Sequence, residues 1–276
     1  MPTYRGKNSY RTFLKAGRSI AGKIARLDGV IGILGTGSIG RRFGDRFSDL
    51  DLVVYAHSDS IKRLRRLVSV GWTGYKGMEF DIPVESFERA LAARVPSRFW
   101  TQVRRWDHQI SQILHDTNGQ IKKLLRDKLV YPEREQKELL ERYRGEIQEH
   151  LVFLPELWAS RGRPYNVNHA LMRAVEKIVL WIYARNKLFE PYTAKWLFYH
   201  LEVKAVPEHV HLGALTEVFT QPTRSISGAL RLRRKLLRLC DRVGLKWEIN
   251  SYSEAHRRAI ENWARVSEET RKLLKW

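Results

Sequence analysis

The pattern of hydrophobic and polar positions changes character part-way along the chain. In the first part, short apolar runs at residues 29–34, 48–55 and 78–84 predict buried strands. Apolar residues at helical spacing predict amphipathic helices over residues 8–27 and 60–70. Strands with helices between them indicate a small mixed sheet covered by helices, of the α/β or α+β class.

Beyond Val84 the strand pattern fades and helical spacing dominates. Helices are predicted over 85–95, 99–115, 119–129, a long charged segment from Pro132, 166–188, 191–201, 207–219, 225–243 and 253–274. Pro155 is expected to kink or end the long charged helix. The change in pattern predicts a sheet domain over residues 1–115 and an all-α helical domain over residues 116–276. The boundary is expected between residues 90 and 130.

Small residues and two carboxylates gather around the first two predicted strands. Gly37 and Ser38 follow the first apolar run, and Asp49 and Asp51 lie near the start of the second. Because side chains alternate along a strand, both carboxylates are expected on one face. A Gly-Ser turn leaves N–H groups and a hydroxyl for phosphate oxygens, while carboxylates are hard oxygen ligands for Mg²⁺. This stretch therefore predicts a site for a divalent cation that carries a phosphate chain.

A third carboxylate lies on the third predicted strand. Asp81 shares a face of that strand with Glu79, so either residue could be the third carboxylate of the site. Asp81 could complete the metal site or act as the general base on an attacking hydroxyl. Two metal ions about 3.5–4 Å apart could then serve the attacking and the leaving oxygens. Carboxylates that converge repel one another without a cation, so their convergence would favour metal.

The stretch from Gly37 to Leu52 resembles the nucleotidyltransferase superfamily typified by DNA polymerase beta. The shared pattern is Gly-Ser, a nearby Arg, and then Ser-Asp-x-Asp followed by a hydrophobic residue. The resemblance extends over residues 29–82. It implies two sets of site residues: nucleotide-binding Gly37, Ser38 and Arg41, and metal-binding Asp49, Asp51 and Asp81.

The helical part has a looser resemblance to the aminoglycoside and lincosamide nucleotidyltransferases. It is carried by residues 181–187, Pro191 and residues 195–197. It implies that Lys195 contacts a phosphate or the substrate; the alternative is an ordinary lysine on a helix surface.

The charge balance points to an anionic partner. The 276 residues include 50 Lys and Arg against 30 Asp and Glu, a formal net charge of +20. Such a surface attracts polyanions, with nucleic acid as the first candidate, and the arginines between 231 and 242 could follow a phosphate backbone. The alternative is a charge-rich, solvated surface.

Other features bear on where the protein works. Cys240 is the single cysteine, so the sequence excludes a disulfide framework. No apolar run approaches the roughly 20 residues that span a bilayer, and the first residues lack an apolar signal core. We expect a cytoplasmic protein without a membrane partner.

Together these features predict an enzyme. A Mg²⁺-dependent nucleotidyltransferase would move a nucleoside monophosphate from an NTP such as ATP to an acceptor hydroxyl and release pyrophosphate. The acceptor would be RNA, for example a tRNA 3′ end bound by the basic helical part, or a small molecule. The alternatives are a non-catalytic nucleic-acid-binding protein on a nucleotidyltransferase scaffold and a nucleotidyltransferase that modifies protein side chains.

Overall fold

The computed structural model describes residues 7–71, 79–246, 254 and 257. Its contacts divide the chain into two compact units. The sheet unit is drawn from Pro2–Glu135 and Leu188–Tyr192, and the helical unit from Gln136–Lys187 and Thr193–Trp276. The division falls after residue 135, whereas the boundary expected after residue 115 falls within a strand of the sheet. The two-domain arrangement itself stays a prediction, and the helix predicted over residues 253–274 lies almost wholly outside the described residues.

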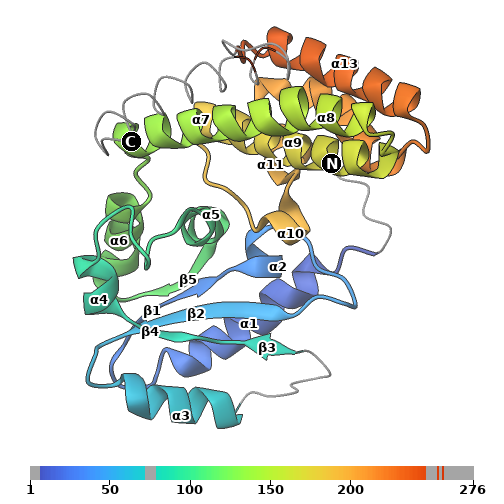
Figure 1. Cartoon of the computed structure of the whole chain (residues 1–276). Helices are drawn as coiled ribbons and strands as arrows, with labels where there is room; N and C mark the ends of the chain where they lie inside the picture. Colours follow the sequence, from blue (N-terminus) through green and yellow to red (C-terminus); the bar gives the residue numbers. More distant parts are fainter. Residues whose placement is uncertain (1–6, 72–78, 247–253, 255–256, 258–276) are drawn as a thin grey trace, which may run out of the picture. The chain divides into compact units, whose positions relative to one another are not determined.

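The sheet unit is built on one small mixed sheet (Figure 1). Within the described residues its five strands are β1 (Val30–Gly35), β2 (Leu50–Ala56), β3 (Phe80–Asp81), β4 (Val84–Ser86) and β5 (Gln112–Asp116). The order is β3-β2-β1-β5, and β4 pairs with β2 on the same edge as β3. Strand β1 is antiparallel to β2 and β5, while β3 and β4 are parallel to β2. The expected small mixed sheet with helices around it is confirmed.

The helix predicted over residues 99–115 is wrong in its last residues, which form a strand. Helix α5 (Gln102–Ile110) ends where β5 begins, and β5 pairs with β1 through Ile113 opposite Leu34. Ile110, Ile113 and Leu114 recur at spacings of three and four, which imitates a helical stripe. Pairing with a strand far away in the sequence overrides that local pattern.

Helices cover both faces of the sheet (Figure 1). On one face, α1 (Tyr10–Ile24) and α3 (Ile61–Gly71) pack on the β2 residues Leu50, Leu52 and Val54. On the other face, α4 (Phe87–Ala92) and α6 (Gln120–Lys128) contribute to a core that includes Val53, Tyr55 and Trp100. Because residues alternate along β2, Asp51 belongs to the face of Val53 and Tyr55.

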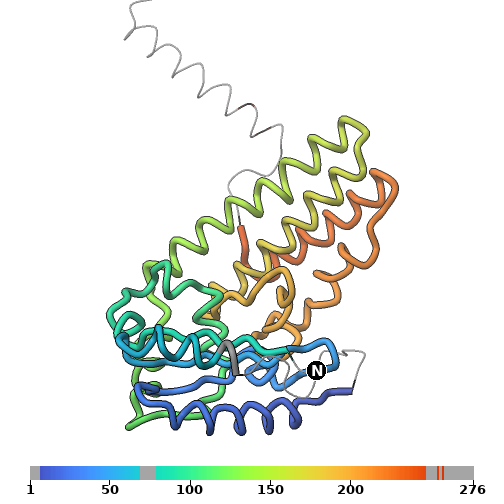
Figure 2. The backbone as a smooth tube through the Cα atoms, turned by 90° about the horizontal axis from the view of Figure 1, so that it is seen from below, coloured from blue at the N-terminus to red at the C-terminus, as the bar shows by residue number. Residues whose placement is uncertain are grey.

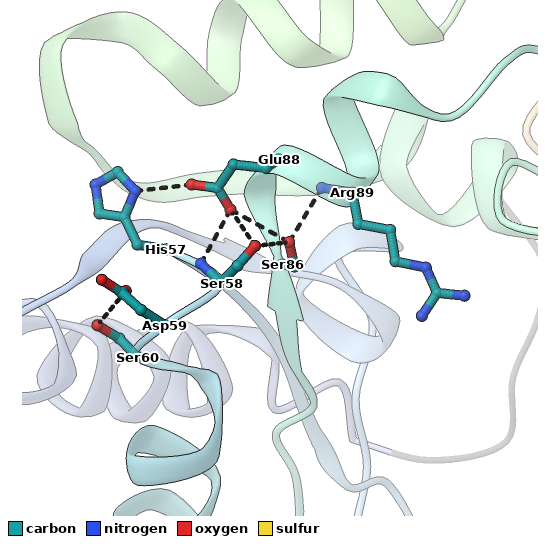
Figure 3. A network of polar contacts seen from close by, with 7 residues as sticks. All are labelled: His57, Ser58, Asp59, Ser60, Ser86, Glu88 and Arg89. Atoms are coloured by element: carbon teal, nitrogen blue, oxygen red, sulfur yellow. Dashed lines mark hydrogen bonds and ion pairs between the residues drawn. The ribbon is translucent and has the colours of Figure 1, made fainter.

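Polar contacts hold the end of β2 against the start of α4 (Figure 3). The Glu88 carboxylate accepts from the Ser58 N–H at 3.0 Å and lies 2.8 Å from His57 Nδ1. Burial favours the neutral carboxyl, but hydrogen bonds from Ser58 and His57 outweigh it and lower the pKa of Glu88 to about 2. Ser86 caps α4 by accepting from the Arg89 N–H at 3.0 Å. The network thus fastens a strand to a helix.

A buried ion pair ties Leu188–Tyr192 into the sheet unit. Arg105, which is fully buried, donates to Glu135 at 2.5 Å, and Gln102 donates to the same carboxylate at 2.9 Å. Gln102 also accepts from the Glu190 N–H at 3.3 Å, and the Arg105 guanidinium lies 4.6 Å from the Phe189 ring centroid. The pair therefore fixes where this returning segment lies in the sheet unit.

The helical unit is organised around one buried helix. Its longer elements are α7 (Glu133–Ile147), the π-helical turn η3 (Gln148–Phe153), α8 (Leu154–Ser160), α9 (Pro164–Arg185), α12 (Leu212–Thr220) and α13 (Ile226–Arg242). Short helices lie at α10 (Thr193–Trp196), α11 (Tyr199–Glu202) and η4 (Pro207–His211). Figures 1 and 2 show α7 to α8 as one long rod with α9 and α13 alongside, and α9 contacts α8, α12 and α13.

The predicted core of α9 is confirmed: Leu171, Val175, Ile178, Val179 and Ile182 are all buried. The helical path does not end at Pro155, because the proline lies in the first turn of α8 directly after the π-helical turn, and the expected kink stays a prediction. None of the helices in the described part of the chain has the length and apolar character needed to cross a membrane.

Candidate functional site

Gly37 lies at the centre of the candidate site. It begins the four-residue helix α2 (Gly37–Gly40) directly after β1, with φ +46°. Its N–H donates to Asp107 Oδ1 at 3.4 Å, and a Cβ at this position would overlap the Asp51 carboxylate. A glycine is required here both by its backbone conformation and by this close approach. Carboxylates from β2 and α5 therefore meet at the start of α2.

Negative charge is concentrated around Asp51. Burial, and after it the neighbouring Asp49, raise the pKa of its carboxyl to about 6. Arg41 opposes the shift, while Asp107 and Asp81 add to it. A carboxylate that is partly buried and surrounded by other acids favours a proton or a cation.

Asp107 is the site residue that the sequence reading missed. It lies on α5, between buried Trp106 and His108. Burial raises its pKa, against the lowering effects of the Gly37 hydrogen bond and of Arg41 and Arg104. An aspartate enclosed by an aromatic residue and a histidine was the one weak signal, since nothing in the sequence joins α5 to α2.

Ser38 has a role in holding the site together. Its side chain is fully buried, and its hydroxyl donates to the Asp49 carbonyl oxygen at 2.9 Å. The bond ties α2 to the residue that precedes β2. The contact of Ser38 with a triphosphate, implied by the resemblance, stays a prediction.

The other expected carboxylates lie at the edge of the sheet. Asp81 is exposed and pairs in register with Asp51 across the parallel β2–β3 ladder. Glu79 is also exposed, and its carbonyl oxygen accepts from the Leu50 N–H at 2.9 Å. Asp81 is among the charges that raise the pKa of Asp51, whereas Glu79 is not. This geometry favours Asp81 over Glu79 as the third carboxylate.

The two basic residues of the expected site lie in different units. Arg41 is half-buried at the C-terminus of α2 and lowers the pKa of Asp51. Lys195 is exposed on α10 of the helical unit. Its part in nucleotide binding stays a prediction.

The acids around Gly37 have the ligand chemistry that Mg²⁺ prefers. Within the described residues, no three His, Cys, Asp or Glu side chains converge as a ready-made metal site. Mg²⁺ usually needs only one or two carboxylates, because substrate phosphates and waters complete its octahedral shell. The raised pKa of Asp51 reflects the burial of its charge and then repulsion from the neighbouring acids, and a bound cation would offset both. Asp51 and Asp49 are the residues that would hold the ion.

Comparison with known proteins adds a distant similarity. No family model matches the sequence, and no curated protein matches it. The chain is similar to the crystal structure of a nucleotidyltransferase-like protein from Exiguobacterium sibiricum 255-15. The two are 14% identical, the match covers 82% of this chain and 74% of that chain, and the TM-score is 0.41. A similarity this distant carries no argument about chemistry.

Gly37→Ala should disrupt the site. A methyl group would displace the Asp51 carboxylate, and the positive φ adds about 1–3 kcal/mol of backbone strain. The matched control is Gly22→Ala in α1, where a Cβ meets nothing within 4 Å and should stabilise the helix by roughly 0.5–1 kcal/mol. Urea unfolding of both variants checks this. Equal stability of the Gly37 variant and the wild type would contradict the close packing described.

The stability of the protein should respond to pH through Asp51. Its pKa is raised in the folded state, so its favourable contribution is complete below about pH 3.8 and is lost as pH rises through about 6. In EDTA, Asp51→Asn should therefore gain stability over the wild type as pH rises from 5 to 8, by about 1.4 kcal/mol, because only about one pH unit of this range lies below the pKa of about 6. Urea unfolding at several pH values measures the difference. A difference that is constant across this range would show that the pKa of Asp51 is not raised in the folded protein.

Proposed function

We propose that this chain is a Mg²⁺-dependent nucleotidyltransferase that moves a nucleoside monophosphate from an NTP to an acceptor hydroxyl. The observation that carries the proposal is the Asp51 carboxylate packed against Gly37, with its pKa raised by burial and by Asp49, Asp107 and Asp81. Several carboxylates beside a glycine turn suit the binding of an NTP together with its Mg²⁺. The motif order from Gly37 to Asp51, which resembles the nucleotidyltransferase superfamily, supports the same reaction.

The proposed step is an in-line displacement at the α-phosphorus. The acceptor oxygen forms a bond to that phosphorus, the bond to the bridging oxygen breaks, and pyrophosphate leaves with the bonding electrons. Bound Mg²⁺ would supply charge neutralisation of the phosphate oxygens. Asp51 and Asp49 would hold the ion, and Asp81 would accept the proton of the acceptor hydroxyl. Most of the rate enhancement would come from positioning and electrostatics.

Asp107 acts in this proposal as a positioning residue. Its Oδ1 accepts the Gly37 N–H and so orients the turn against which Asp51 packs. Its negative charge also helps to keep the pKa of Asp51 raised until a cation binds.

The two rivals are less well supported. A non-catalytic nucleic-acid-binding protein has no use for several acids crowded around a glycine turn, since they repel a polyanion. A protein-modifying nucleotidyltransferase would use the same nucleotide site and differ in its acceptor.

The test is incubation of the purified chain with each α-labelled NTP, Mg²⁺, and either total RNA or a small-molecule cell extract. We expect label to move to one of the two acceptor fractions with release of pyrophosphate, and EDTA to stop the reaction. Absence of transfer from every NTP to every fraction would refute the proposal.

A further inference from the structure

The basic residues of α13 fall into two classes. Arg233 is used internally: it donates to the Leu151 carbonyl oxygen at 2.8 Å and to Glu156 at 2.9 Å. Lys235 pairs with Glu217 at 2.5 Å. The others are exposed and make no hydrogen bond or ion pair with the residues that the structure describes: Arg231, Arg234, Arg238 and Arg242.

These four arginines form one stripe. Their spacing of three, four and four residues places them on one face of the helix, over about 16 Å of its length. The face that carries Leu232, Leu236 and Leu239 is buried. Four guanidinium groups in a row repel one another, so such an arrangement favours an extended anion.

The stripe ends at a concave site. A pocket of about 310 Å³ is lined by Arg242, Arg185 and His211 together with Glu208. Arg185 is held in place because its Nη1 donates to the Val243 carbonyl oxygen, and its guanidinium lies 5.4 Å from the Trp181 ring centroid. The pocket therefore presents the Arg185 guanidinium, held by Val243, together with Arg242 at the end of the helix. The Glu208 carboxylate in the same lining accepts a hydrogen bond from Asn186 at 3.3 Å.

We propose that this α13 stripe and the pocket at its end bind the phosphate backbone of a single RNA strand. A guanidinium group can donate two parallel hydrogen bonds to one phosphate. A row of four such groups could contact successive phosphates along one strand. The net charge of +20 would steer the polyanion to the protein. A membrane surface is disfavoured, because the apolar face of α13 is buried and has nothing to insert into lipid.

The choice of RNA rests on the proposed function. Transfer of a nucleoside monophosphate needs an acceptor hydroxyl, and the RNA 3′ end presents two. The inference thus names the acceptor class of that reaction.

The test is binding of a fluorescent single-stranded RNA of mixed sequence, measured by anisotropy across a salt series without nucleotide. The variant Arg231→Gln/Arg234→Gln/Arg238→Gln should bind at least tenfold more weakly, with the slope of log K against log salt reduced by about 2, since each phosphate contact on a single strand contributes about 0.7. The matched control is Arg11→Gln/Lys15→Gln/Arg18→Gln on α1, which removes three exposed charges at similar spacing. It should keep the wild-type slope, and thermal unfolding confirms that both variants fold.

Several outcomes would overturn the inference. Equal losses in the two triple variants would mean that binding follows net charge alone. Tighter binding to DNA of the same sequence, or to vesicles containing phosphatidylserine, would name another partner. Nucleotide transfer to a small molecule without RNA binding would overturn this inference and leave the proposed function standing. If the protein binds RNA through the α13 stripe but transfers no nucleotide, the RNA-binding surface is supported and the proposed function is refuted.

Discussion

Asp51→Asn should lower nucleotide transfer by roughly 10³-fold or more while the protein remains folded. Charge stabilisation by a bound metal contributes several kcal/mol, and each 1.36 kcal/mol corresponds to a factor of ten in rate. Asparagine keeps the size of the side chain against Gly37 but removes the charge that would hold the cation. Transfer of α-labelled nucleotide, measured at saturating Mg²⁺, checks the prediction.

The control for this variant is Asp28→Asn. The Asp28 side chain is 92% exposed and pairs with Arg63 at 3.1 Å, so it is a solvated carboxylate, unlike the partly buried Asp51. It should keep wild-type activity. Transfer at the wild-type rate by the Asp51 variant would show that the reaction does not take place at this site.

Glu135→Ala should lower the free energy of unfolding by about 3–5 kcal/mol, because it leaves the fully buried Arg105 charge without its partner. The same change removes the acceptor of the Gln102 amide, which is the residue that holds the Glu190 backbone. Both the ion pair and the anchoring of Leu188–Tyr192 are therefore lost together. Urea unfolding at neutral pH measures the effect.

Two further variants separate this effect from general damage. The double variant Arg105→Met/Glu135→Leu should recover much of the lost stability, since apolar residues of similar volume replace buried ion pairs at little cost. Asp28→Ala, which breaks the exposed pair with Arg63, should cost less than about 1 kcal/mol. A loss at Glu135 no larger than that at Asp28 would contradict the burial of the pair.

The fold could be predicted from the sequence where local pattern and tertiary structure agree. Strands β1 and β2 have apolar runs that are buried on both faces, and α9 has a continuous apolar core. Strand β5 was missed because Ile110, Ile113 and Leu114 imitate a helix and only pairing with β1 makes the segment extended. The π-helical turn before Pro155 could not be predicted, because such a turn has no simple sequence signature.

Only those residues of the candidate site that lie close together in the sequence could be predicted. Gly37, Asp49 and Asp51 lie within a short stretch, so their proximity follows from one turn and one strand. Asp107 comes from α5, and its contact with the Gly37 N–H depends on how α5 packs against α2. An aspartate between an aromatic residue and a histidine is only a weak signal, and it does not indicate which element the carboxylate contacts.

The central claim is nucleotidyl transfer at the Gly37–Asp51 site, and one paired labelling experiment tests it most directly. The chain is incubated with Mg²⁺ and an acceptor fraction, using NTP labelled at the α-phosphate in one reaction and at the γ-phosphate in the other. We predict that the α-label moves to the acceptor while the γ-label leaves as pyrophosphate, and that Asp51→Asn stops both. Movement of the γ-label to the acceptor would show phosphoryl transfer instead and would contradict the claim.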